Sequence, residues 1–587
     1  MKSQQRCVFC AFLFVSVAMA YQKISKYLLV TGALLLLFVT GTANADITFS
    51  VDSFQKISAL EGGFGAGLQS PDLFGHDVAD IGDLDGDGNT DIAVGAFGDD
   101  DGGFNTGAVW ILFLNANGTV KSKQKISETQ GGFGGNLNTN AVFGSYLASL
   151  DDLDGDGLTD LVVSNYGDDD GGLDRGAAWI LFLNSNGTVK GQQKISQLQG
   201  GFGGSLNNSD LFGRDVAKIG DLDGDGVTEI AVGAVQDDDG GSNRGAVWIL
   251  FMNSDGTVKA EQKISDTQGG FNGVLNNNDL FGQAVAGIGD IDGDEVPDLV
   301  VGAAYDDDGG TDRGALWVLL MNSDGTVKAE QKISDTQGGF QGVLDDSDNF
   351  GWSVGKVGDL NLDGIPDLVT SAAADDDGGL NKGAVWLLFL NADGTVKAEQ
   401  KISATAGGFG GALDNGDLFG SSVTRLTDLD GNGVADLVVG ARVDDDGGNA
   451  TGAVWVLFLK NSVPPSIGGS VTGIVPNTVN CLNETTGQSV FFALGKGSTS
   501  WNCEAQGLLA DPGERIVMTV AGSVPRKFDF NSDGCIDIAD VQRVIDETQR
   551  PEPRDPAFDV NGDGVVNIAD ARALVLIADN PGGAPCE

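Results

Sequence analysis

The sequence predicts an all-β protein whose main part is a six-bladed β-propeller. One observation is a unit of 69 residues that recurs six times along the chain. It is marked most clearly by a tryptophan at Trp110, Trp179, Trp248, Trp317, Trp386 and Trp455. Another is that each unit contains four short strand-like segments, and no segment of the repeats has the 3.6-residue period of a helix. Four-stranded units repeated about an axis form the blades of a propeller.

The four strands of a blade can be placed in the first unit. They are expected at residues 74–83, 91–97, 107–115 and 119–127. The second and third segments are almost continuously apolar, which is typical of strands covered on both faces. Asn117-Gly118, between the third and fourth segments, is a strong signal for a two-residue hairpin turn.

The two ends of the repeat array indicate how the ring closes. The tetrapeptide QKIS ends the fourth strand of a unit, and its first copy, at Gln55, precedes the first complete unit. The sixth tryptophan segment has no QKIS after it. We therefore expect residues 47–58 to supply the fourth strand of the last blade, which protects edges that an open array would expose. The propeller should span residues 46–462.

The N-terminus has the pattern of an export signal. Residues 28–39 are apolar, follow two lysines and precede the A-x-A cleavage pattern at 43–45. The mature chain should then begin at residue 46, with residues 1–45 removed and a true start possible at Met19. A second apolar run lies upstream, and neither run is long enough to predict a membrane span. The predicted location is secreted, extracellular or at the cell surface.

Composition narrows the classes of partner. The 587 residues carry a formal charge of -50, from 84 acidic and 34 basic residues. Such a surface excludes nucleic acid, because phosphate binding needs clustered basic residues. It fits carboxylates partly neutralised by bound cations, and also fits an acidic surface that is only solvated.

A ladder of carboxylates lies between the first two strands of every unit. In the first unit Asp83, Asp85, Asp87 and Asp91 occupy positions 1, 3, 5 and 9 of a loop with glycine at position 6. Alternate oxygen ligands around a sharp turn are the pattern that binds calcium. The other units offer Asp152, Asp154, Asp156 and Asp160; Asp221, Asp223, Asp225 and Glu229; Asp290, Asp292, Asp294 and Asp298; Asp359, Asn361, Asp363 and Asp367; and Asp428, Asp430, Asn432 and Asp436. Glu295 replaces the glycine in the fourth loop, which weakens the prediction there.

These motifs together resemble the FG-GAP repeat of integrin alpha-subunit propellers. A Phe-Gly pair opens each unit, at Phe74, Phe143, Phe212, Phe281, Phe350 and Phe419. Gly-Ala ends the second strand in four units, at Gly95, Gly233, Gly302 and Gly440. Ser164-Asn165 and Ser371-Ala372 replace Gly-Ala in the other two. The resemblance implies a calcium-binding extracellular propeller, although integrin propellers have seven blades, so their ligand geometry does not transfer to six.

A second acidic motif, DDDGG, follows the second strand of each unit. It begins at Asp99, Asp168, Asp237, Asp306, Asp375 and Asp444. At about 3.3 Å per residue the strand should place it on the face opposite the carboxylate ladders. It could be a polyvalent site for cations or a basic ligand, but a solvated turn is the favoured interpretation. The loops with GGF should share that face. Each phenylalanine could grip a ligand, but tucking over a blade edge is the favoured interpretation.

Two smaller modules are predicted after the propeller. Residues 463–525 read as a small β-domain that follows a Pro464-Pro465 linker. The mature chain has four cysteines, and an even number in an exported protein favours disulfides. Proximity favours Cys481–Cys503 and Cys535–Cys586, although four cysteines allow three pairings.

Residues 526–587 contain two more calcium-type loops, each followed by an apolar-patterned helix. Their expected ligands are Asp529, Asn531, Asp533, Asp537 and Asp540, then Asp559, Asn561, Asp563, Asn567 and Asp570. Aspartate at position 12 and a tandem pair with only exit helices resemble the dockerin module, which implies cohesin as a partner. Ile538-Ala539 and Ile568-Ala569 differ from the polar pair of many cohesin-binding dockerins. A calcium-stapled cap is the alternative. The chain should bind about eight calcium ions, six in the propeller and two here.

These features favour a non-catalytic scaffold or adhesin that binds an extracellular protein or glycan. The alternatives are an extracellular polysaccharide-degrading enzyme or its accessory subunit, and a structural surface-layer component. The sequence offers no catalytic residue beyond abundant carboxylates. Four residues that break the sixfold pattern, His76, Tyr146, Tyr166 and Trp352, are expected to be dispersed rather than gathered in a site.

Overall fold

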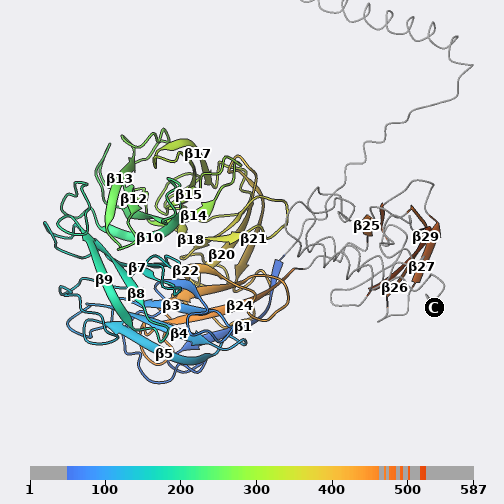
Figure 1. Cartoon of the computed structure of the whole chain (residues 1–587), viewed down its shortest axis with the longest axis horizontal. Coiled ribbons are helices and arrows are strands. Elements are labelled where there is room, and N and C mark those ends of the chain that lie inside the picture. Colours follow the sequence, from blue (N-terminus) through green and yellow to red (C-terminus); the bar gives the residue numbers. More distant parts are fainter. Residues whose placement is uncertain are drawn as a thin grey trace, which may run out of the picture. The chain divides into compact units, whose positions relative to one another are not determined.

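The computed structural model describes residues 49–461 in full, and the backbone of five strands between residues 468 and 523. Residues 49–461 form six four-stranded antiparallel sheets arranged around a common centre (Figure 1). The predicted all-β propeller of six blades is therefore confirmed. Across the described part of the chain no helix is long and apolar enough to cross a membrane.

Within each blade the strands follow one another from the centre of the propeller outward. The first blade contains β2 (Val78–Gly82), β3 (Asp91–Ala96), β4 (Ala108–Leu114) and β5 (Val120–Ser127). The second contains β6 (Leu147–Ser149), β7 (Leu161–Asn165), β8 (Ala177–Leu183) and β9 (Val189–Ser196). The third contains β10 (Phe212–Gly220), β11 (Glu229–Ala234), β12 (Ala246–Met252) and β13 (Val258–Ser265). The fourth contains β14 (Ala284–Gly289), β15 (Asp298–Ala303), β16 (Ala315–Met321) and β17 (Val327–Ser334). The fifth contains β18 (Phe350–Gly358), β19 (Asp367–Ala372), β20 (Ala384–Leu390) and β21 (Val396–Ser403).

The sixth blade combines both ends of the array. It contains β22 (Phe419–Leu426), β23 (Asp436–Ala441) and β24 (Ala453–Asn461), and its outermost strand is β1 (Phe49–Ser58). β1 pairs antiparallel with β24, with Lys56 opposite Trp455 and Ser58 opposite Ala453. The ring is thus closed by backbone hydrogen bonds between segments about 400 residues apart in the sequence.

The core is divided among the contacts between neighbouring blades. Six clusters of buried apolar side chains each join one blade to the next, including one that joins the sixth blade to the first. The phenylalanines of the GGF loops are buried within them. Phe133 packs edge-on against Trp179 of the second blade, with ring centroids 5.1 Å apart, and stacks on Phe143 at 4.8 Å. The predicted burial of these phenylalanines is confirmed.

The glycines of the FG and GAP motifs meet where two blades touch. A Cβ on Gly95 would overlap the carbonyl oxygen of Gly144 in the next blade, so glycine allows the backbones to approach closely. In the second blade Ser164 stands at the equivalent position, and its hydroxyl donates to the carbonyl of Gly213. Ser164 is therefore accommodated by a side-chain hydrogen bond across the same contact, whereas the hydroxyl of Ser371 accepts from the N–H of Ser353 in its own blade.

The backbone after the propeller forms two small sheets. β26 (Val475–Asn483) lies between β27 (Ser489–Ala493) and β29 (Ile516–Ser523). β25 (Gly468–Ser470) pairs with β28 (Ser500–Asn502). The predicted signal segment, both disulfides and the two tail loops lie outside the described residues, and the domain boundaries stay predictions.

Candidate functional site

Each A–B loop, defined here as the nine-residue segment between the first two strands of a blade, is wound around its first aspartate. In the first loop, residues 83–91, the N–H of Asp87 donates to Asp83 Oδ1 at 2.9 Å. The N–H of Gly88 donates to Asp83 Oδ2 at 2.8 Å. Equivalent pairs of bonds recur around Asp152, Asp221, Asp290, Asp359 and Asp428. The sequence repeat therefore produces six copies of one loop geometry.

The ninth residue of each loop is a buried carboxylate that ties the loop to the blade. Asp91 Oδ2 accepts from the N–H of Leu84 and Oδ1 from the N–H of Leu114, both at 3.0 Å. Burial raises the pKa of Asp91 to about 6. The same pair of backbone bonds is made by Asp160, Glu229, Asp298, Asp367 and Asp436. An acid buried in this way is stabilised in its charged form by a neighbouring cation.

Carboxylate oxygens converge in five of the six loops. Three acidic side chains of one loop bring oxygens within 4.8 Å of one another. The groups are Asp83, Asp85 and Asp91; Asp152, Asp154 and Asp160; Asp221, Asp223 and Asp225; Asp290, Asp292 and Asp294; and Asp428, Asp430 and Asp436. Glu229 and Asp298, at position 9, are not part of the groups in their own loops. The fifth loop is the one described loop without such a group, and it has an amide, Asn361, at position 3.

The oxygens that remain free fit a hard cation. Asp85 Oδ1 and Asp292 Oδ1 are buried within their loops, and no protein hydrogen-bond donor reaches them. An all-oxygen donor set with an unpartnered buried oxygen is the chemistry that calcium accepts. The individual ligand assignments, in all six loops and in the tail, remain predictions.

A lysine from the outermost strand reaches the outer side of five loops. Lys121 Nζ lies 2.6 Å from Asp85 Oδ2 and 2.5 Å from Asp87 Oδ2. Lys190, Lys259, Lys328 and Lys397 contact their own loops in the same way. The ammonium contacts Oδ2 of Asp85 and leaves Oδ1 facing the other carboxylates. In the sixth blade β1 carries Asp52 at this position, and Asp52 pairs instead with Lys460.

The fourth loop forms its turn in spite of Glu295. Glu295 adopts a left-handed conformation with φ 71°, and its N–H donates to Asp290 Oδ2 at 2.8 Å, as Gly88 does to Asp83. A non-glycine residue in this region costs about 1–2 kcal/mol. The replacement thus strains the fourth loop without changing its shape.

The DDDGG motif is an ion-pair clamp within each blade. Lys125, the lysine of QKIS, places Nζ 2.5 Å from Asp99 Oδ2 and 2.7 Å from Asp101 Oδ2, and all three side chains are largely buried. The clamp lysine recurs as Lys56, Lys194, Lys263, Lys332 and Lys401. β3 separates this motif from the A–B loop, so the two acidic motifs lie at opposite ends of the strand. The first aspartate of each motif is buried and paired with the lysine, the third is paired but partly exposed, and the middle one faces solvent, so the motif is not an open polyvalent ligand surface.

The residues that break the sixfold pattern gather at the centre of the propeller, so the expectation that they are dispersed is wrong. The rings of His76 and Tyr146 are 5.0 Å apart. The guanidinium of Arg214 lies 4.8 Å from the ring centroid of Tyr146 and 5.8 Å from that of Trp352. Arg442 lies 4.8 Å from the ring centroid of Trp352. We call these five residues the axial cluster.

The repeat register contained the signal for this cluster. His76, Arg214 and Trp352 occupy the same position of the first, third and fifth units. In a propeller, equal positions of the innermost strands meet near the axis, whatever their separation along the chain. Burial, followed by the charges of Arg442 and Arg214, holds the pKa of His76 well below its usual range, so the imidazole is neutral.

Comparison with known proteins gives the same two motif families. Residues 212–250, 281–319, 350–388 and 419–457 match the FG-GAP repeat, and residues 527–576 match the dockerin type I domain. Integrin alpha-3 of Cricetulus griseus is 34% identical over 202 residues, which is 34% of this chain and 17% of the integrin. Integrin alpha-PS2 of Drosophila melanogaster is 32% identical over 232 residues, or 38% of this chain and 15% of the integrin. The similarity thus covers less than a fifth of each of these integrins.

Two solved structures align with 71% of the chain at low similarity. They are BBS1N in complex with ARL6DN, with a TM-score of 0.32 and 10% identity, and a DUF4221 family member from Bacteroides vulgatus, with 0.31 and 9%.

Proposed function

We propose that this FG-GAP-repeat propeller with a dockerin type I module is a non-catalytic, extracellular calcium-binding scaffold. In this proposal the propeller presents a binding surface for a protein or glycan, and the tail docks the chain to a cohesin-like partner. The six A–B loops are the observation that carries the proposal. Each is wound around one carboxylate, and five of them bring three acidic side chains together.

Calcium is the ion that suits these loops. The donors are carboxylate, amide and backbone oxygens, and calcium takes six to eight such ligands in flexible geometry. The formal charge of -50 further favours divalent cations, because each bound ion offsets two charges of the loops. We assign about six ions to the propeller and two to the tail.

The described residues give little support to a catalytic alternative. His76, the only histidine of the chain, is buried and neutral, and its Nδ1 lies 2.6 Å from the carbonyl oxygen of Ser145. Its Nε2 faces the Arg442 guanidinium at 3.4 Å, which leaves no ring nitrogen for a substrate. The buried carboxylates of the blades are held by backbone N–H groups or by the clamp lysines. A role in adhesion or docking therefore fits better than hydrolysis.

Calcium titration calorimetry on the mature chain tests the proposal. Changing both Asp85 and Asp87 to Asn should remove one of about eight bound ions, because it neutralises two ligands of the first loop. The matched control is Asp100→Asn, in the middle of the DDDGG motif, where the Asp100 side chain accepts only from the N–H of Asn105. The control should lose no ion. A parent protein that binds no calcium would refute the proposal, and equal losses in both variants would refute the assignment to A–B loops.

A further inference from the structure

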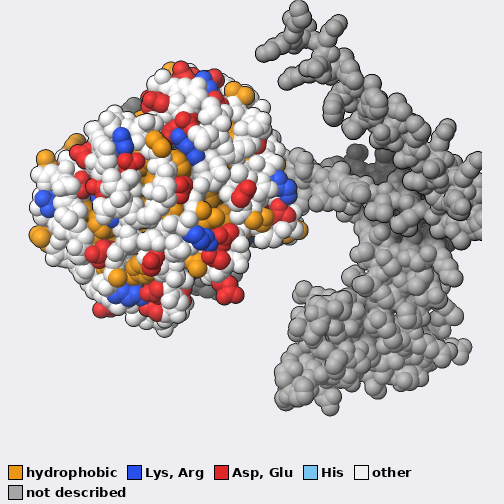
Figure 2. Space-filling model, turned by 90° about the horizontal axis from the view of Figure 1, so that it is seen from above, with side chains coloured by type: hydrophobic (Ala, Val, Ile, Leu, Met, Phe, Trp, Pro, Cys, Tyr) orange, Lys and Arg blue, Asp and Glu red, His pale blue; other side chains and the backbone are white. Residues whose placement is uncertain are grey.

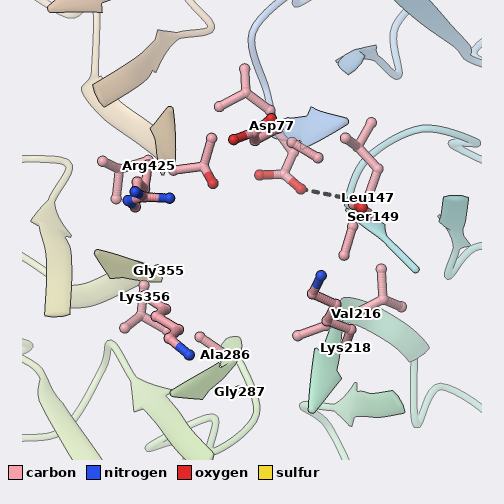
Figure 3. Close-up of a pocket in the computed structure, with 18 of the residues that line it drawn as sticks. Asp77, Leu147, Ser149, Val216, Lys218, Ala286, Gly287, Gly355, Lys356 and Arg425 are labelled. Carbon is pink, nitrogen blue, oxygen red and sulfur yellow. Dashed lines mark hydrogen bonds between the residues drawn. The ribbon is translucent and has the colours of Figure 1, made fainter. Parts of the chain in front are cut away.

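A cavity of about 440 Å³ lies at the centre of the propeller (Figure 3). It is lined by the innermost strands of all six blades, β2, β6, β10, β14, β18 and β22. Its size falls within the range of about 300–1,000 Å³ that is usual for small-molecule sites. Neither the calcium assignment nor the repeat motifs give this cavity a role.

One ring of the cavity wall is made of small residues. Five of the six residues at one repeat position are alanine or glycine, and the sixth is threonine. They are Ala79, Ala148, Ala217, Ala286, Gly355 and Thr424. The strand sequences therefore leave a space between the cluster and the A–B loop end.

The mouth of the cavity is basic. Lys218, Lys356 and Arg425 occupy one repeat position on the third, fifth and sixth blades, and their side chains extend into the central space in Figure 3. Asp80 of the first blade occupies the same position, so three cations and one carboxylate share this ring. Lys356 is exposed and Lys218 is half-buried, whereas Asp77 and Asp215 at the inner end are buried. This gradient of exposure places the opening at the A–B loop end.

Two of the three cations make no direct ion pair, although the Asp80 carboxylate on the same wall interacts with the charges of Arg425 and Lys218. Lys218 pairs with Asp151, but within residues 49–461 no carboxylate lies within ion-pair distance of Lys356 or Arg425. Arg425 Nε is buried and meets no acceptor. Although the Lys356 side chain reaches solvent, the surrounding wall partly desolvates its ammonium. This desolvation, together with the charges of Lys218 and Arg425, lowers the pKa of Lys356. An anion at the mouth would relieve this repulsion and supply the missing acceptor.

The inner end of the cavity is lined by carboxyl and hydroxyl groups. Asp77 and Asp215 each accept a backbone N–H of the next blade, from Leu147 and Val285 at 2.7 Å. Ser353 accepts in the same way from Val423, at 3.0 Å. Carboxyl and hydroxyl groups at this depth suit hydroxyl groups of a ligand, and they disfavour a second negative charge. The ring of acidic A–B loops around the mouth likewise disfavours a polyanion.

We propose that this cavity binds a small hydroxylated carboxylate, with its carboxylate between Lys356 and Arg425 and its hydroxyl groups directed toward Asp77, Asp215 and Ser353. A sugar acid has this chemistry, either free or as the terminal uronate of a polysaccharide. The proposal is independent of the calcium sites, since its cationic groups are outside the loops.

Titration of the calcium-loaded mature chain with D-glucuronate tests the proposal, with D-glucose as the uncharged probe. Glucuronate should bind at least tenfold more tightly than glucose. Lys356→Gln and Arg425→Gln should each weaken glucuronate binding at least tenfold and leave the calcium count unchanged. The matched control is Lys460→Gln, which removes an exposed lysine paired with Asp52 on the outer strands and should change nothing.

A second arm separates the two sources of the carboxylate. An oligosaccharide with a terminal glucuronate should compete if the site takes chain ends, and only the monosaccharide should bind if it takes free sugar acids. Either result supports the site. Equal affinity for glucuronate and glucose, observed by saturation-transfer NMR on the unmodified protein, would overturn it even if a variant failed to fold. Equal weakening by Lys460→Gln would also overturn it. If this proposal fails, calcium binding measured on the same samples still tests the proposed function separately.

Discussion

At the scale of single residues, the same amino acid has different roles because its surroundings differ. Asp83 organises a loop through backbone N–H groups, and Asp99 is neutralised by a clamp lysine. Asp215 lies buried at the axis, where it accepts the N–H groups of Val216 and Val285. Burial raises the pKa of Asp215 above its usual range, and also that of Asp77, which faces it.

The raised pKa predicts how Asp215 affects stability as the pH changes. The folded carboxyl keeps its proton to higher pH than the unfolded one, so its contribution is complete at acidic pH and is lost as pH rises through the folded pKa. Asp215→Asn keeps a side-chain acceptor but does not titrate. Between pH 5 and pH 8 the parent should lose about 1–3 kcal/mol of unfolding free energy relative to this variant, since one pKa unit corresponds to about 1.4 kcal/mol.

Urea unfolding at several pH values measures this difference. The groups that face Asp215 are Asp77 and the Arg214 guanidinium, and both are present in parent and variant. Ser353→Ala is the control, because Ser353 makes the equivalent bond to the next blade and does not titrate. The difference in unfolding free energy between Ser353→Ala and the parent should stay constant with pH. A constant difference for Asp215→Asn as well would contradict the prediction.

At the scale of strands and blades, two devices hold each unit together. The clamp lysine ties the outermost strand to the turn after the second strand, and the glycine contact brings neighbouring blades together. Both recur with the repeat, so each blade is nearly interchangeable in its local chemistry. The exception is the sixth blade, where the clamp joins Lys56 of β1 to Asp444 and Asp446 at the other end of the array.

Removing a clamp lysine should destabilise the propeller strongly. Lys263→Met keeps the aliphatic stem but leaves Asp237 buried and unpaired, which typically costs about 3–5 kcal/mol. Adding Asp237→Asn and Asp239→Asn should recover much of the loss, because no buried charge then remains. Lys460→Met, which breaks an exposed pair, should cost no more than about 1 kcal/mol. Chemical denaturation compares the four proteins, and similar losses for both lysines would refute the clamp.

The shared sixth blade makes the N-terminal strand essential for the ring. Deleting residues 46–58 removes β1, exposes the edge of β24 and leaves Asp444 without Lys56. The deletion protein should melt at a lower temperature, and its open edge should promote aggregation. The control is Lys56→Met, which keeps the strand and loses only the clamp. A deletion protein that stays monomeric and melts with the parent would disprove closure by β1.

At the scale of the whole molecule, charge is the dominant constraint. Acidic and basic side chains are interspersed over the side of the propeller seen in Figure 2. The described ion pairs are largely formed inside single blades. Their basic partners are already counted in the net charge of -50, so an excess of acidic side chains remains. Bound calcium would reduce the remaining repulsion around the A–B loops.

Removing calcium should therefore lower the stability of the entire ring. Extracellular calcium sites often have a Kd near 10⁻⁴–10⁻³ M, so each site in millimolar calcium contributes about 0.4–1.4 kcal/mol. Six sites would contribute about 2–8 kcal/mol, which for a domain of this size corresponds to a fall in Tm of about 2–10 °C. Calorimetry in 1 mM calcium and in excess chelator measures this change. Magnesium at the same concentration should not restore the Tm. An unchanged Tm in chelator would show that the A–B loops are solvated turns that bind no stabilising calcium.

The sequence by itself determined the fold class, the number of blades, the strand order within a blade and the positions of the A–B loops. It could do so because these features are local and repeat with a fixed period, so six copies report the same hydrogen-bonding and burial pattern. Even the displaced QKIS copy is a local signal, read at Gln55. The roles of the DDDGG motif, the axial cluster and the axial cavity were decided only by the tertiary structure. Lys125 meets Asp99 across a blade. His76, Arg214 and Trp352 gather at the centre of the ring, although they lie in the first, third and fifth units of the chain. Closure of the ring brings equal positions of the innermost strands close together, and no single stretch of the chain contains that arrangement.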